Sequence, residues 1–382
     1  MKKFLDCISI VGATPSKFHG TKKYISTGAV ATTEIDESEV VEVTYEDRPS
    51  RANLSAEAGD ILFAKMQGTR KTLLLDSETE KNIYSTGFYA VRANPEVITT
   101  ECLYYLIDSE LFLAQKDKNC SGATQKAITN GGMAKIEISV PPLSEQGILV
   151  DKLKHLTQLI ADKKKQLNLF DEIIKSRFIE MFEDPVTNPL RWAMLPLEKC
   201  LTVLGGYAFK SEEFKTSGVP VLRIGNINTG AFTPTNMVYW SKDDCLTRYQ
   251  VLPGDLVISL TGTVGKDDYG NVCILGNAYP MYYLNQRNAK LILDDELNKH
   301  YLSELLKFSQ IKKKLTGISR GVRQANISNR DILNLVVPIP PIEIQVQFAA
   351  FVEQVDKSKF EIQQSLEKLE ILKKSLMQQY FG

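Results

Sequence analysis

Basic and amide side chains gather in two loops of this 382-residue chain, one near its middle and one near its end. Between positions 305 and 330 every charged residue is Lys or Arg, and between 116 and 135 lysines outnumber a single aspartate. DNA phosphates are contacted mainly by Lys and Arg, whereas base edges are read by Arg, Asn and Gln. The two loops therefore favour contact with nucleic acid. The alternative is a basic surface that meets only water.

Two further segments of the second half place Arg beside Asn or Gln, namely RIGNI at 223–227 and NQRN at 285–288. Arg pairs bidentately with guanine, and Asn or Gln pairs with adenine, although either segment alone also fits an ordinary turn. We predict DNA-binding residues in both halves of the chain, within these loops and segments and also outside them. In the second half they are Lys210, Arg223, Asn226, Thr261, Asn285, Gln286, Arg287, Lys312, Arg320, Arg323, Gln324 and Asn326. In the first half they are Lys65, Gln67, Arg70, Lys71, Gln125 and Lys126.

Patterns that would indicate catalysis or a bound cofactor are not found in the sequence. The three histidines lie far apart, and none belongs to a recognisable nucleophile motif. The phosphate-binding patterns GxxxxGK[ST] and GxGxxG are absent, and the nearest candidate, TGTVGK at 261–266, is followed by two aspartates. The six cysteines show no CxxC or Cys/His spacing, which argues against a zinc site and a disulfide framework. We predict a non-catalytic chain that itself holds no metal or cofactor.

The N-terminus, the lack of a long apolar run and the cysteines together predict a cytoplasmic protein. The chain has 46 Lys and Arg residues and 46 Asp and Glu residues, so its formal net charge is zero. Any DNA site must therefore be a local basic patch. The segment MKKFLDCISIVG has an apolar run broken by Asp6 and lacks the cleavage pattern of a secretory signal. No apolar run approaches the ~18 residues of a membrane span. Unpaired cysteines agree with a reducing compartment, and no membrane partner is expected.

The two basic loops recur because a longer segment is duplicated. ATQKAITNGGMAKIEISVPPLSEQ at 123–146 reappears as VRQANISNRDILNLVVPIPPIEIQ at 322–345, at a constant shift of 199 residues. The same shift carries 144–182 onto 343–381, and both segments follow a Pro-Pro pair. Proline suits the first turn of a helix, and we predict Ser144 as the N-cap of the first segment.

Both duplicated segments have the apolar spacing of coiled-coil helices. Apolar residues that recur every seven positions form one seam of a coiled coil. Each segment would give a helix of ~37 residues, roughly 55 Å long, and the two copies are each other's obvious partners. The alternative is that each helix packs on its own globular domain. The seam residues are Leu153, Ile160, Leu167, Ile174 and Met181 in the first segment and Val355, Ile362, Leu369 and Leu376 in the second.

A globular block precedes each helix, and both blocks fit mixed α and β structure. AGDILFAKMQGT at 58–69 and PGDLVISLTGT at 253–263 each indicate a Gly-Asp turn, a buried strand and a polar glycine loop. Helical stretches follow at 99–115 and 297–315. We therefore predict a mixed α/β fold made by tandem duplication. Its parts are a domain at 1–142, a spacer helix at 143–184, a second domain at 185–341 and a C-terminal spacer helix at 342–382.

The sequence resembles the specificity subunits of Type I restriction–modification systems. The resemblance rests on the proline-marked helix starts at 140–146 and 339–345, and on the helix ends KSRFIEMF and KSLMQQYF. It also rests on GGYAFKSEEF, GVPVLRIGNI, PGDLVIS, YLNQR and GVRQANIS in the second block, and on AGDILFAKMQGT and YSTGFYAVRA in the first. These segments occur in the expected order along essentially the whole chain.

This resemblance implies two target-recognition domains separated by two antiparallel helices in a pseudo-two-fold arrangement. Each domain would read one half of a bipartite DNA site from the major groove, while the helices would fix the spacer and dock methyltransferase subunits. The implied partners are double-stranded DNA, methyltransferase subunits and ATP-dependent restriction (translocase) subunits. S-adenosylmethionine, ATP and Mg²⁺ would be bound by those subunits rather than by this chain.

The sequence leaves the recognition residues of the first block and the type of system open. The first block has YSTGF at 84–88 where the second has its NQR segment, so the two half-sites are expected to differ. Similar recognition subunits also serve systems in which methylation and cleavage are carried out by one polypeptide. This sequence does not distinguish such a system from a Type I system. A coiled-coil scaffold without a DNA role is a third interpretation.

Overall fold

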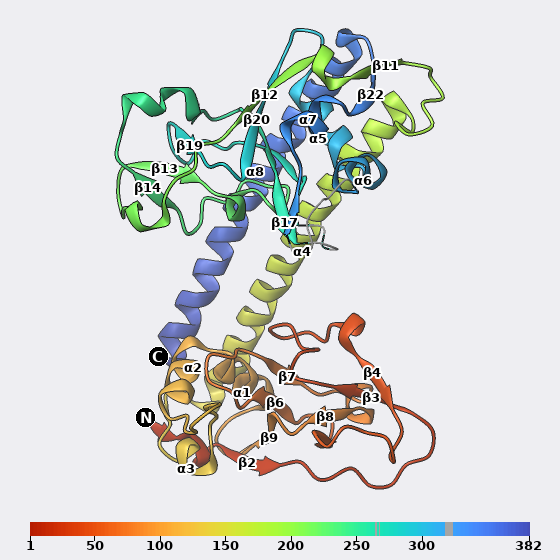
Figure 1. The fold of residues 1–382 in the computed structure, drawn as a ribbon. Coiled ribbons are helices and arrows are strands. Elements are labelled where there is room, and N and C mark those ends of the chain that lie inside the picture. The colour runs from red at the N-terminus through yellow and green to blue at the C-terminus, as the bar shows by residue number, and fades with distance from the viewer. Residues whose placement is uncertain (264–265, 267, 318–323) are drawn as a thin grey trace. The chain divides into compact units, whose positions relative to one another are not determined.

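The chain divides into two units, each built from one β-rich domain and parts of two long helices (Figure 1). The first unit comprises Met1–Lys165 and Gln363–Gly382, and the second comprises Gln166–Ile362. The long helices are α4 (Leu143–Phe182) and α8 (Ile342–Phe381), so each unit holds the start of one helix and the end of the other. The computed structural model describes residues 1–263, 266, 268–317 and 324–382.

Two four-stranded sheets form the domain of the first unit. One has the strand order β2-β9-β6-β7 with antiparallel neighbours, and the other has the order β4-β3-β8-β5, in which β3 runs parallel to β8. A short antiparallel pair, β1-β10, joins the N-terminus to the segment before α4. The strands are β1 (Lys2–Lys3), β2 (Ile8–Val11), β3 (Lys22–Ile25), β4 (Val41–Val43), β5 (Ala52–Leu54), β6 (Ile61–Ala64), β7 (Thr72–Leu74), β8 (Ile83–Ser85), β9 (Phe88–Ala93) and β10 (Glu137–Ile138). The helices are α1 (Thr100–Ile107), α2 (Glu110–Lys118) and α3 (Asn130–Met133), with 3-10 turns at Phe4–Asp6, Glu37–Glu39 and Thr79–Lys81.

The domain of the second unit repeats this topology. Its sheets have the orders β12-β20-β16-β18 and β14-β13-β19-β15, again with one parallel pair, β13 and β19, and the short pair is β11-β22. The predicted mixed α/β fold with two globular domains and two long helices is confirmed, and the structure shows that both domains are β-rich. The strands are β11 (Ala193–Pro196), β12 (Leu201–Gly205), β13 (Val219–Leu222), β14 (Val238–Trp240), β15 (Gln250–Val251), β16 (Leu256–Ser259), β17 (Thr261–Thr263), β18 (Val272–Ile274), β19 (Tyr282–Leu284), β20 (Asn288–Leu293), β21 (Gln324–Asn326) and β22 (Val336–Ile339). The helices are α5 (Lys299–Lys307), α6 (Ser309–Thr316) and α7 (Asn329–Leu333), with 3-10 turns at Leu197–Lys199, Ser211–Glu213, Ile224–Asn226 and Asp244–Tyr249.

A Gly-Asp turn leads into a central strand of each domain. Gly59 has a φ of 86°, in the left-handed region where glycine meets no steric penalty. The carboxylate of Asp60 accepts the amide N–H of the residue three before it and forms an ion pair with Arg92 (2.6 Å). Asp255 does the same in the second domain, where its ion-pair partner is Lys290 (2.7 Å). The strands that follow, β6 and β16, are buried throughout, as the sequence predicted.

The long helices pack on each other in opposite directions. In the second unit the rings of Phe178 on α4 and Phe348 on α8 meet edge to face, with centres 5.5 Å apart. Asp171, earlier on α4, pairs with Lys359, later on α8 (2.5 Å). Every predicted seam residue is buried or half-buried, which agrees with a coiled-coil contact. In the described part of the chain, no helix combines the length and the apolar character needed to cross a membrane.

The C-terminal end of each long helix also packs on a domain, and in both cases it is the domain that does not directly precede that helix in the chain. Phe182 belongs to the hydrophobic core of the second domain, and Met377 and Phe381 belong to that of the first. Each domain is therefore held by the start of one long helix and the end of the other.

The first long helix begins at Leu143, two residues before the start that an N-cap at Ser144 would give. The carbonyl of Pro142 accepts amide N–H groups from Glu145 (2.9 Å) and Gln146 (3.2 Å), which places Leu143 in the first turn. Ser144 therefore lies inside the helix, and its prediction as N-cap is wrong. Pro142, the second residue of the proline pair, directly precedes the helix. Its backbone carbonyl accepts the first amide hydrogen bonds of the helix, and no side-chain cap from Ser144 is involved.

His300, at the start of α5, is a buried titratable group that faces the second long helix. Its Nε2 lies 3.6 Å from Oε1 of Glu353 on α8. Burial lowers the pKa of His300 below its ordinary value, and Lys299 lowers it further, whereas Glu353, Asp356 and Glu304 act in the opposite direction. The folded unit therefore favours the neutral imidazole.

We expect the second unit to lose stability in mild acid because of this histidine. The pKa of His300 is lower in the folded state than the ~6.5 of an unfolded chain, so the unfolded state takes up the proton first as the pH falls. The contribution is complete above about pH 6.5 and is lost progressively below it. Urea unfolding at about pH 7.5 and about pH 5.5 should show a larger fall for the natural chain than for His300→Gln. Equal falls in both proteins would contradict this assignment.

Candidate nucleic-acid interface

Three loops of the second unit meet where β16 ends. Leu260, directly after β16, donates its amide N–H to the carbonyl of Arg287 in the loop after β19 (2.8 Å). Ile327, after β21, donates its N–H to the carbonyl of Leu260 (2.8 Å). Pairing of β17 with β21 then places Thr261 opposite Asn326. Backbone bonds thus bring the predicted residues Thr261, Arg287 and Asn326 together, and we call this arrangement the loop cluster.

The first unit contains the same loop cluster. Lys65 donates its amide N–H to the carbonyl of Gly87 (2.9 Å), and Ile128 donates its N–H to the carbonyl of Lys65 (2.9 Å). Gln67 donates its amide N–H to the carbonyl of Lys126 (3.0 Å), which holds the glycine loop against the loop before α3. The two segments that recur in the sequence are therefore neighbours in each unit.

The register of the parallel strands shows which residues of the two clusters correspond. Tyr84 on β8 lies opposite Ile25 on β3, as Leu284 on β19 lies opposite Leu222 on β13. Counting onward from these pairs, YSTGF matches LNQRN, so the first unit has Ser-Thr-Gly where the second has Asn-Gln-Arg.

Equivalent positions of the two clusters carry different side chains. Lys65 in the first unit stands where the second has the buried Leu260, and Gly87 stands where the second has the exposed Arg287. The Nζ of Lys65 lies 4.4 Å from the ring centre of Tyr89, and burial lowers the pKa of this lysine. In the first unit the cation is Lys65, directly after the central strand β6. In the second unit it is Arg287, in the loop after β19, the strand that runs parallel to β13.

A pocket of about 440 Å³ opens beside the loop cluster of the second unit. It joins the two segments that sequence analysis singled out, RIGNI and NQRN. An Nη2 hydrogen of Arg223 is donated to the carbonyl of Asn236 (2.5 Å), while its Nε is buried without a hydrogen-bond partner in the part of the chain that the structure describes. The pocket is lined by Phe209, Ser211, Phe214, Arg223, Ile224, Gly225, Asn226, Thr235, Asn236, Asn285, Gln286 and Arg287.

Two of the predicted amides are buried and hold the loops that carry their neighbours. The side chain of Asn226 donates to the carbonyls of Thr233 and Thr235 (both 3.0 Å) and accepts the amide N–H of Arg223 (3.0 Å). Asn285 accepts the amide N–H of Arg287 (3.2 Å) through its side chain. Gln286 and Arg287 are exposed on the loop that Asn285 shapes.

Two predicted cations of the first unit have protein partners. Arg70 forms a bidentate pair with the buried carboxylate of Asp108, with both N–O distances 2.9 Å, and this contact raises the pKa of the guanidinium. Lys71 donates from Nζ to the carbonyl of Thr27 (2.5 Å). In the protein alone, both side chains are engaged in holding the glycine loop.

The remaining predicted cations differ in exposure. Lys312 is buried and donates to the side-chain oxygen of Asn271 (2.6 Å). Lys210 is exposed and lies 3.4 Å from Glu213 in the next turn. Arg320 and Arg323 lie outside the described residues, as does the side chain of Gln324.

Sequence reasoning did not identify two residues that shape the loop clusters. Lys116 is completely buried, and its Nζ donates to the carbonyls of Met66 and Thr69 (both 2.9 Å) underneath the glycine loop. Tyr207 is exposed, and its carbonyl accepts the amide N–H of Gln286 (2.9 Å). Neither shows a local signal, because one looks like an ordinary surface lysine of a helix and the other like a strand residue.

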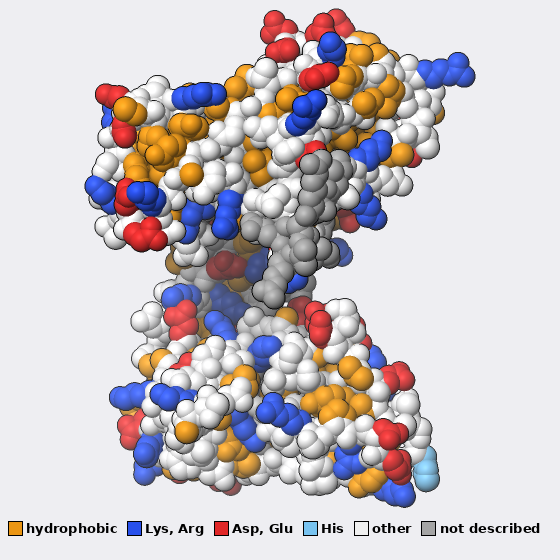
Figure 2. All heavy atoms as spheres, in the orientation of Figure 1, with side chains coloured by type: hydrophobic (Ala, Val, Ile, Leu, Met, Phe, Trp, Pro, Cys, Tyr) orange, Lys and Arg blue, Asp and Glu red, His pale blue; other side chains and the backbone are white. Residues whose placement is uncertain are grey.

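Charges of both signs are mixed on the face of the molecule that Figure 2 shows. Figure 2 shows Lys and Arg side chains interspersed with Asp and Glu on the visible face. Hydrophobic side chains gather over β13 and β14 of the second domain in the same view, where Trp240 packs on Phe209 and Phe214. The pocket therefore has an apolar wall, since both phenylalanines line it.

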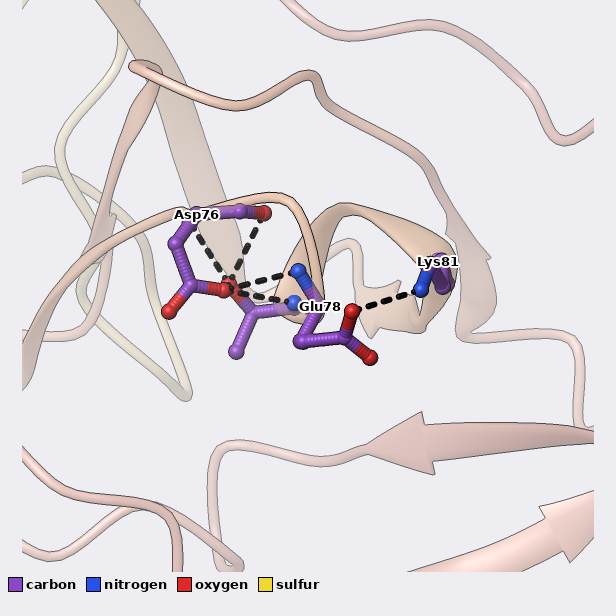
Figure 3. Close-up of polar contacts among 4 residues, drawn as sticks. Asp76, Glu78 and Lys81 are labelled. Atoms are coloured by element: carbon purple, nitrogen blue, oxygen red, sulfur yellow. Dashed lines mark hydrogen bonds and ion pairs between the residues drawn. The ribbon is translucent and has the colours of Figure 1, made fainter.

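The carboxylates of the acidic turn between β7 and β8 form bonds within that turn. One oxygen of Asp76 accepts N–H groups from Glu78 (3.0 Å) and Thr79 (2.8 Å), while Glu78 pairs with Lys81 (2.8 Å; Figure 3). Hydrogen bonds from Thr79 lower the pKa of Asp76, so its charge caps the turn. Among the residues that the structure describes, no group of three or more His, Cys, Asp or Glu side chains is placed to hold a metal ion.

Comparison with known proteins identifies the family. Residues 10–169 and 189–373 match the Type I restriction modification DNA specificity domain. The chain is 25% identical over 322 residues to the type I restriction enzyme MjaVIII specificity subunit of Methanocaldococcus jannaschii, covering 78% of this chain and 73% of that protein.

Two solved structures share the fold. The S subunit of a type I restriction–modification system from M. genitalium is 12% identical, with a TM-score of 0.57 over 99% of this chain and 94% of its own. A second solved chain comes from a structure that describes complex assembly and conformational transition of the type I restriction–modification system. It is 20% identical, with a TM-score of 0.53, and the match covers 98% of this chain and 97% of that chain. With two matches to the family's domain spread over most of its length, the chain belongs to the DNA specificity subunits of type I restriction–modification systems.

Proposed function

We propose that this chain reads a bipartite DNA target, with the domain of each unit recognising one half-site. As a specificity subunit, it is a non-catalytic component that serves DNA recognition. The observation that supports two half-sites is the loop cluster, which is built twice by equivalent backbone bonds and carries different exposed side chains in its two copies.

The exposed side chains of each cluster have the chemistry that base reading requires. In the second unit Gln286 and Arg287 project from a loop fixed by hydrogen bonds, and a fixed loop loses little entropy on binding. Arg on such a loop suits the paired acceptors of guanine. In the first unit Gln67 and Gln125 are exposed beside Lys126, a set that suits adenine and a phosphate. Different side chains on one backbone arrangement would select different bases.

The other predicted residues divide between contact and support in this proposal. In the supporting set the side chains are buried or bonded to the rest of the domain, and the residues are Arg70, Lys71, Asn226, Asn285 and Lys312. In the contacting set the side chains are exposed or half-buried, and the residues are Lys65, Lys210, Arg223, Thr261 and Asn326 together with those named above. Arg320, Arg323 and Gln324 join the contacting set by residue type, because their side chains lie outside the described residues.

The long helices act as the ruler between half-sites in this proposal. The recognition domains are residues 1–142 and 185–341, and the spacer helices are 143–184 and 342–382. A seam of buried apolar residues and ion pairs such as Lys164 with Glu370 (3.1 Å) hold the helices together. Because B-DNA repeats every 10–10.5 base pairs, a fixed separation would favour one spacer length.

The exposed faces of the helices would dock methyltransferase subunits. Ile173 on α4 and Leu372 on α8 occupy equivalent positions at the shift of 199 residues, and both are exposed (45% and 53%). Phe360 and Ile371 add further exposed apolar area to α8. Burial of such side chains favours association. S-adenosylmethionine would be bound by those subunits, and ATP and Mg²⁺ by the restriction subunits.

Binding to duplex DNA at increasing salt tests the proposal. The chain with its methyltransferase subunits should bind duplex DNA that carries the target, because Lys and Arg displace counterions from phosphates. A protein that makes 6–10 phosphate contacts loses roughly 10³–10⁵ in affinity between 50 and 200 mM salt. Fluorescence titrations with a target duplex and with a scrambled duplex of equal length give the two curves. An affinity for the target that does not change with salt would refute the DNA proposal.

A further inference from the structure

A fully buried glutamine stands in the first turn of each long helix. Gln146 on α4 and Gln345 on α8 are both 0% exposed and recur at the shift of 199 residues. They follow the two Pro-Pro pairs by the same number of residues. A side chain of this size and polarity is rarely buried unless its donors and acceptors are satisfied.

Gln146 fastens the start of α4 to the loop before α1. Its side-chain oxygen accepts the amide N–H of Thr99 (2.8 Å), and its Nε2 donates to the carbonyls of Val97 (3.0 Å) and Pro141 (2.9 Å). Thr99 is itself the N-cap of α1, because its hydroxyl accepts the amide N–H of Cys102 (3.4 Å). One amide side chain therefore connects the start of the long helix, the proline pair and the start of a domain helix.

Gln345 makes the same three contacts in the second unit. Its oxygen accepts the amide N–H of Asn298 (2.9 Å), and its Nε2 donates to the carbonyls of Glu296 (3.1 Å) and Pro340 (2.7 Å). Asn298 is the N-cap of α5, the counterpart of α1. The contact is thus preserved atom for atom between two copies whose loop clusters differ.

These bonds determine direction as well as stability. Apolar packing at a helix start tolerates small changes of angle, whereas three directional bonds from one buried amide are satisfied in one orientation. The prolines restrict the backbone immediately before that point. Each long helix therefore leaves its own domain along a line fixed by the glutamine and the proline pair.

We propose that Gln146 and Gln345 are positioning residues that fix the direction of each long helix relative to its own domain and so determine how strictly the spacer between half-sites is measured. This inference rests on the bipartite reading proposed above. Adding one base pair to a spacer rotates one half-site about the DNA axis by roughly 35°. A rigid connection excludes such a target, and a loosened connection accepts it.

The test compares spacer preference in the natural chain and in Gln345→Met, which keeps the length of the side chain and removes its hydrogen bonds. Duplexes with unchanged half-sites and spacers one base pair shorter or longer are titrated with the chain and its methyltransferase subunits. We expect the natural chain to prefer one spacer by about tenfold or more, and Gln345→Met to reduce that preference to about threefold or less. Its selectivity for the bases of each half-site should stay the same.

Tyr282→Phe is the matched control in the same domain. The hydroxyl of Tyr282 donates to the carbonyl of Gly276 (2.8 Å) and accepts the amide N–H of Tyr279 (3.1 Å), away from the start of α8. Its loss should lower the stability of the second unit and leave the spacer preference unchanged. Gln146→Met provides a second variant, in the first unit, should Gln345→Met not fold.

The outcomes separate this inference from the function on which it rests. If both glutamine variants that fold and bind keep the full spacer preference, the positioning role is refuted while bipartite reading stands. If Tyr282→Phe loses the preference as well, the effect is one of general stability and the positioning role is again refuted. If the natural chain binds all spacers equally, the proposed bipartite reading itself fails.

Discussion

Replacing Phe178 by Ala is expected to lower the free energy of unfolding of the second unit by about 3–5 kcal/mol, the usual cost of removing a buried phenyl ring. The ring is 0% exposed and lies where three elements meet. It stacks on Tyr301 of α5, with centres 5.4 Å apart and planes at 15°, and it contacts Phe348 of α8 edge to face (5.5 Å). Its loss would leave a cavity between the long helices and the domain. Urea unfolding of the full chain, followed by tryptophan fluorescence, measures the change.

Ile173→Ala is the control for this prediction. Ile173 lies on the same helix but is exposed, so its truncation should change stability by no more than about 0.5 kcal/mol. Both tryptophans, Trp192 and Trp240, are in the second unit, so the fluorescence reports the unit that carries the change. A Phe178→Ala transition that coincides with that of Ile173→Ala would contradict the helix packing described here.

Arg287→Ala is expected to relax recognition of one half-site and to leave the other unchanged. Arg287 is exposed in the loop cluster of the second unit, while the equivalent position in the first unit is Gly87. A bidentate contact from Arg to guanine contributes about 1–3 kcal/mol of discrimination against the wrong base. Its removal should therefore reduce selectivity at one base pair about 5- to 150-fold. The readout is the set of methylated sites in host DNA, compared between the natural chain and the variant.

Lys65→Ala is the matched variant in the first unit. Lys65 is the cation that follows the central strand β6 of that loop cluster, and its equivalent in the second unit is Leu260. The change should affect the first half-site or its overall affinity and leave the second half-site as it is. If both variants altered the same half-site, the assignment of one half-site to each unit would be wrong.

The long helices were predictable from the sequence because their signals are local and repeated. A sustained seven-residue apolar period and a proline pair placed the first helix at 144–182, and the structure has it at Leu143–Phe182. The tandem duplication followed from a constant shift of 199 residues over 123–182 and from the matching segments at 58–69 and 253–263. The N-cap at Ser144 failed because a helix can take its first acceptor from the backbone carbonyl of Pro142, which leaves no signature in side-chain type.

The candidate site was only partly predictable, because its assembly depends on contacts between distant residues. The sequence identified the segments that carry Lys65 and Ile128 but not the backbone bond that joins them. It also could not separate an amide that reads DNA from one that holds a loop. Asn226 and Gln286 have similar side chains, yet one is buried with three bonds and the other is exposed. Lys116 was counted among the basic residues of its loop, but its buried supporting role was not predicted, since burial of a lysine is decided by the fold.

The repeated glutamine gives the clearest link from sequence to structure. The motif of two prolines followed by glutamine recurs with constant spacing, and in both copies the glutamine makes the same buried contacts. By contrast, the loop clusters share backbone bonds and differ in side chains. This is the pattern we expect of a duplicated DNA-recognition domain. The helix connection is the same in both copies, whereas the side chains that would contact two different half-sites differ.

The reading of one half-site by each unit is tested by mapping the methylated sites of the host with the natural chain and with Arg287→Ala. We expect the natural chain to direct methylation to two short blocks of defined bases separated by a spacer of constant length. With Arg287→Ala, one block should become degenerate, while the other block and the spacer stay the same. A single uninterrupted target, or a variant in which both blocks change together, would contradict the reading of one half-site by each unit.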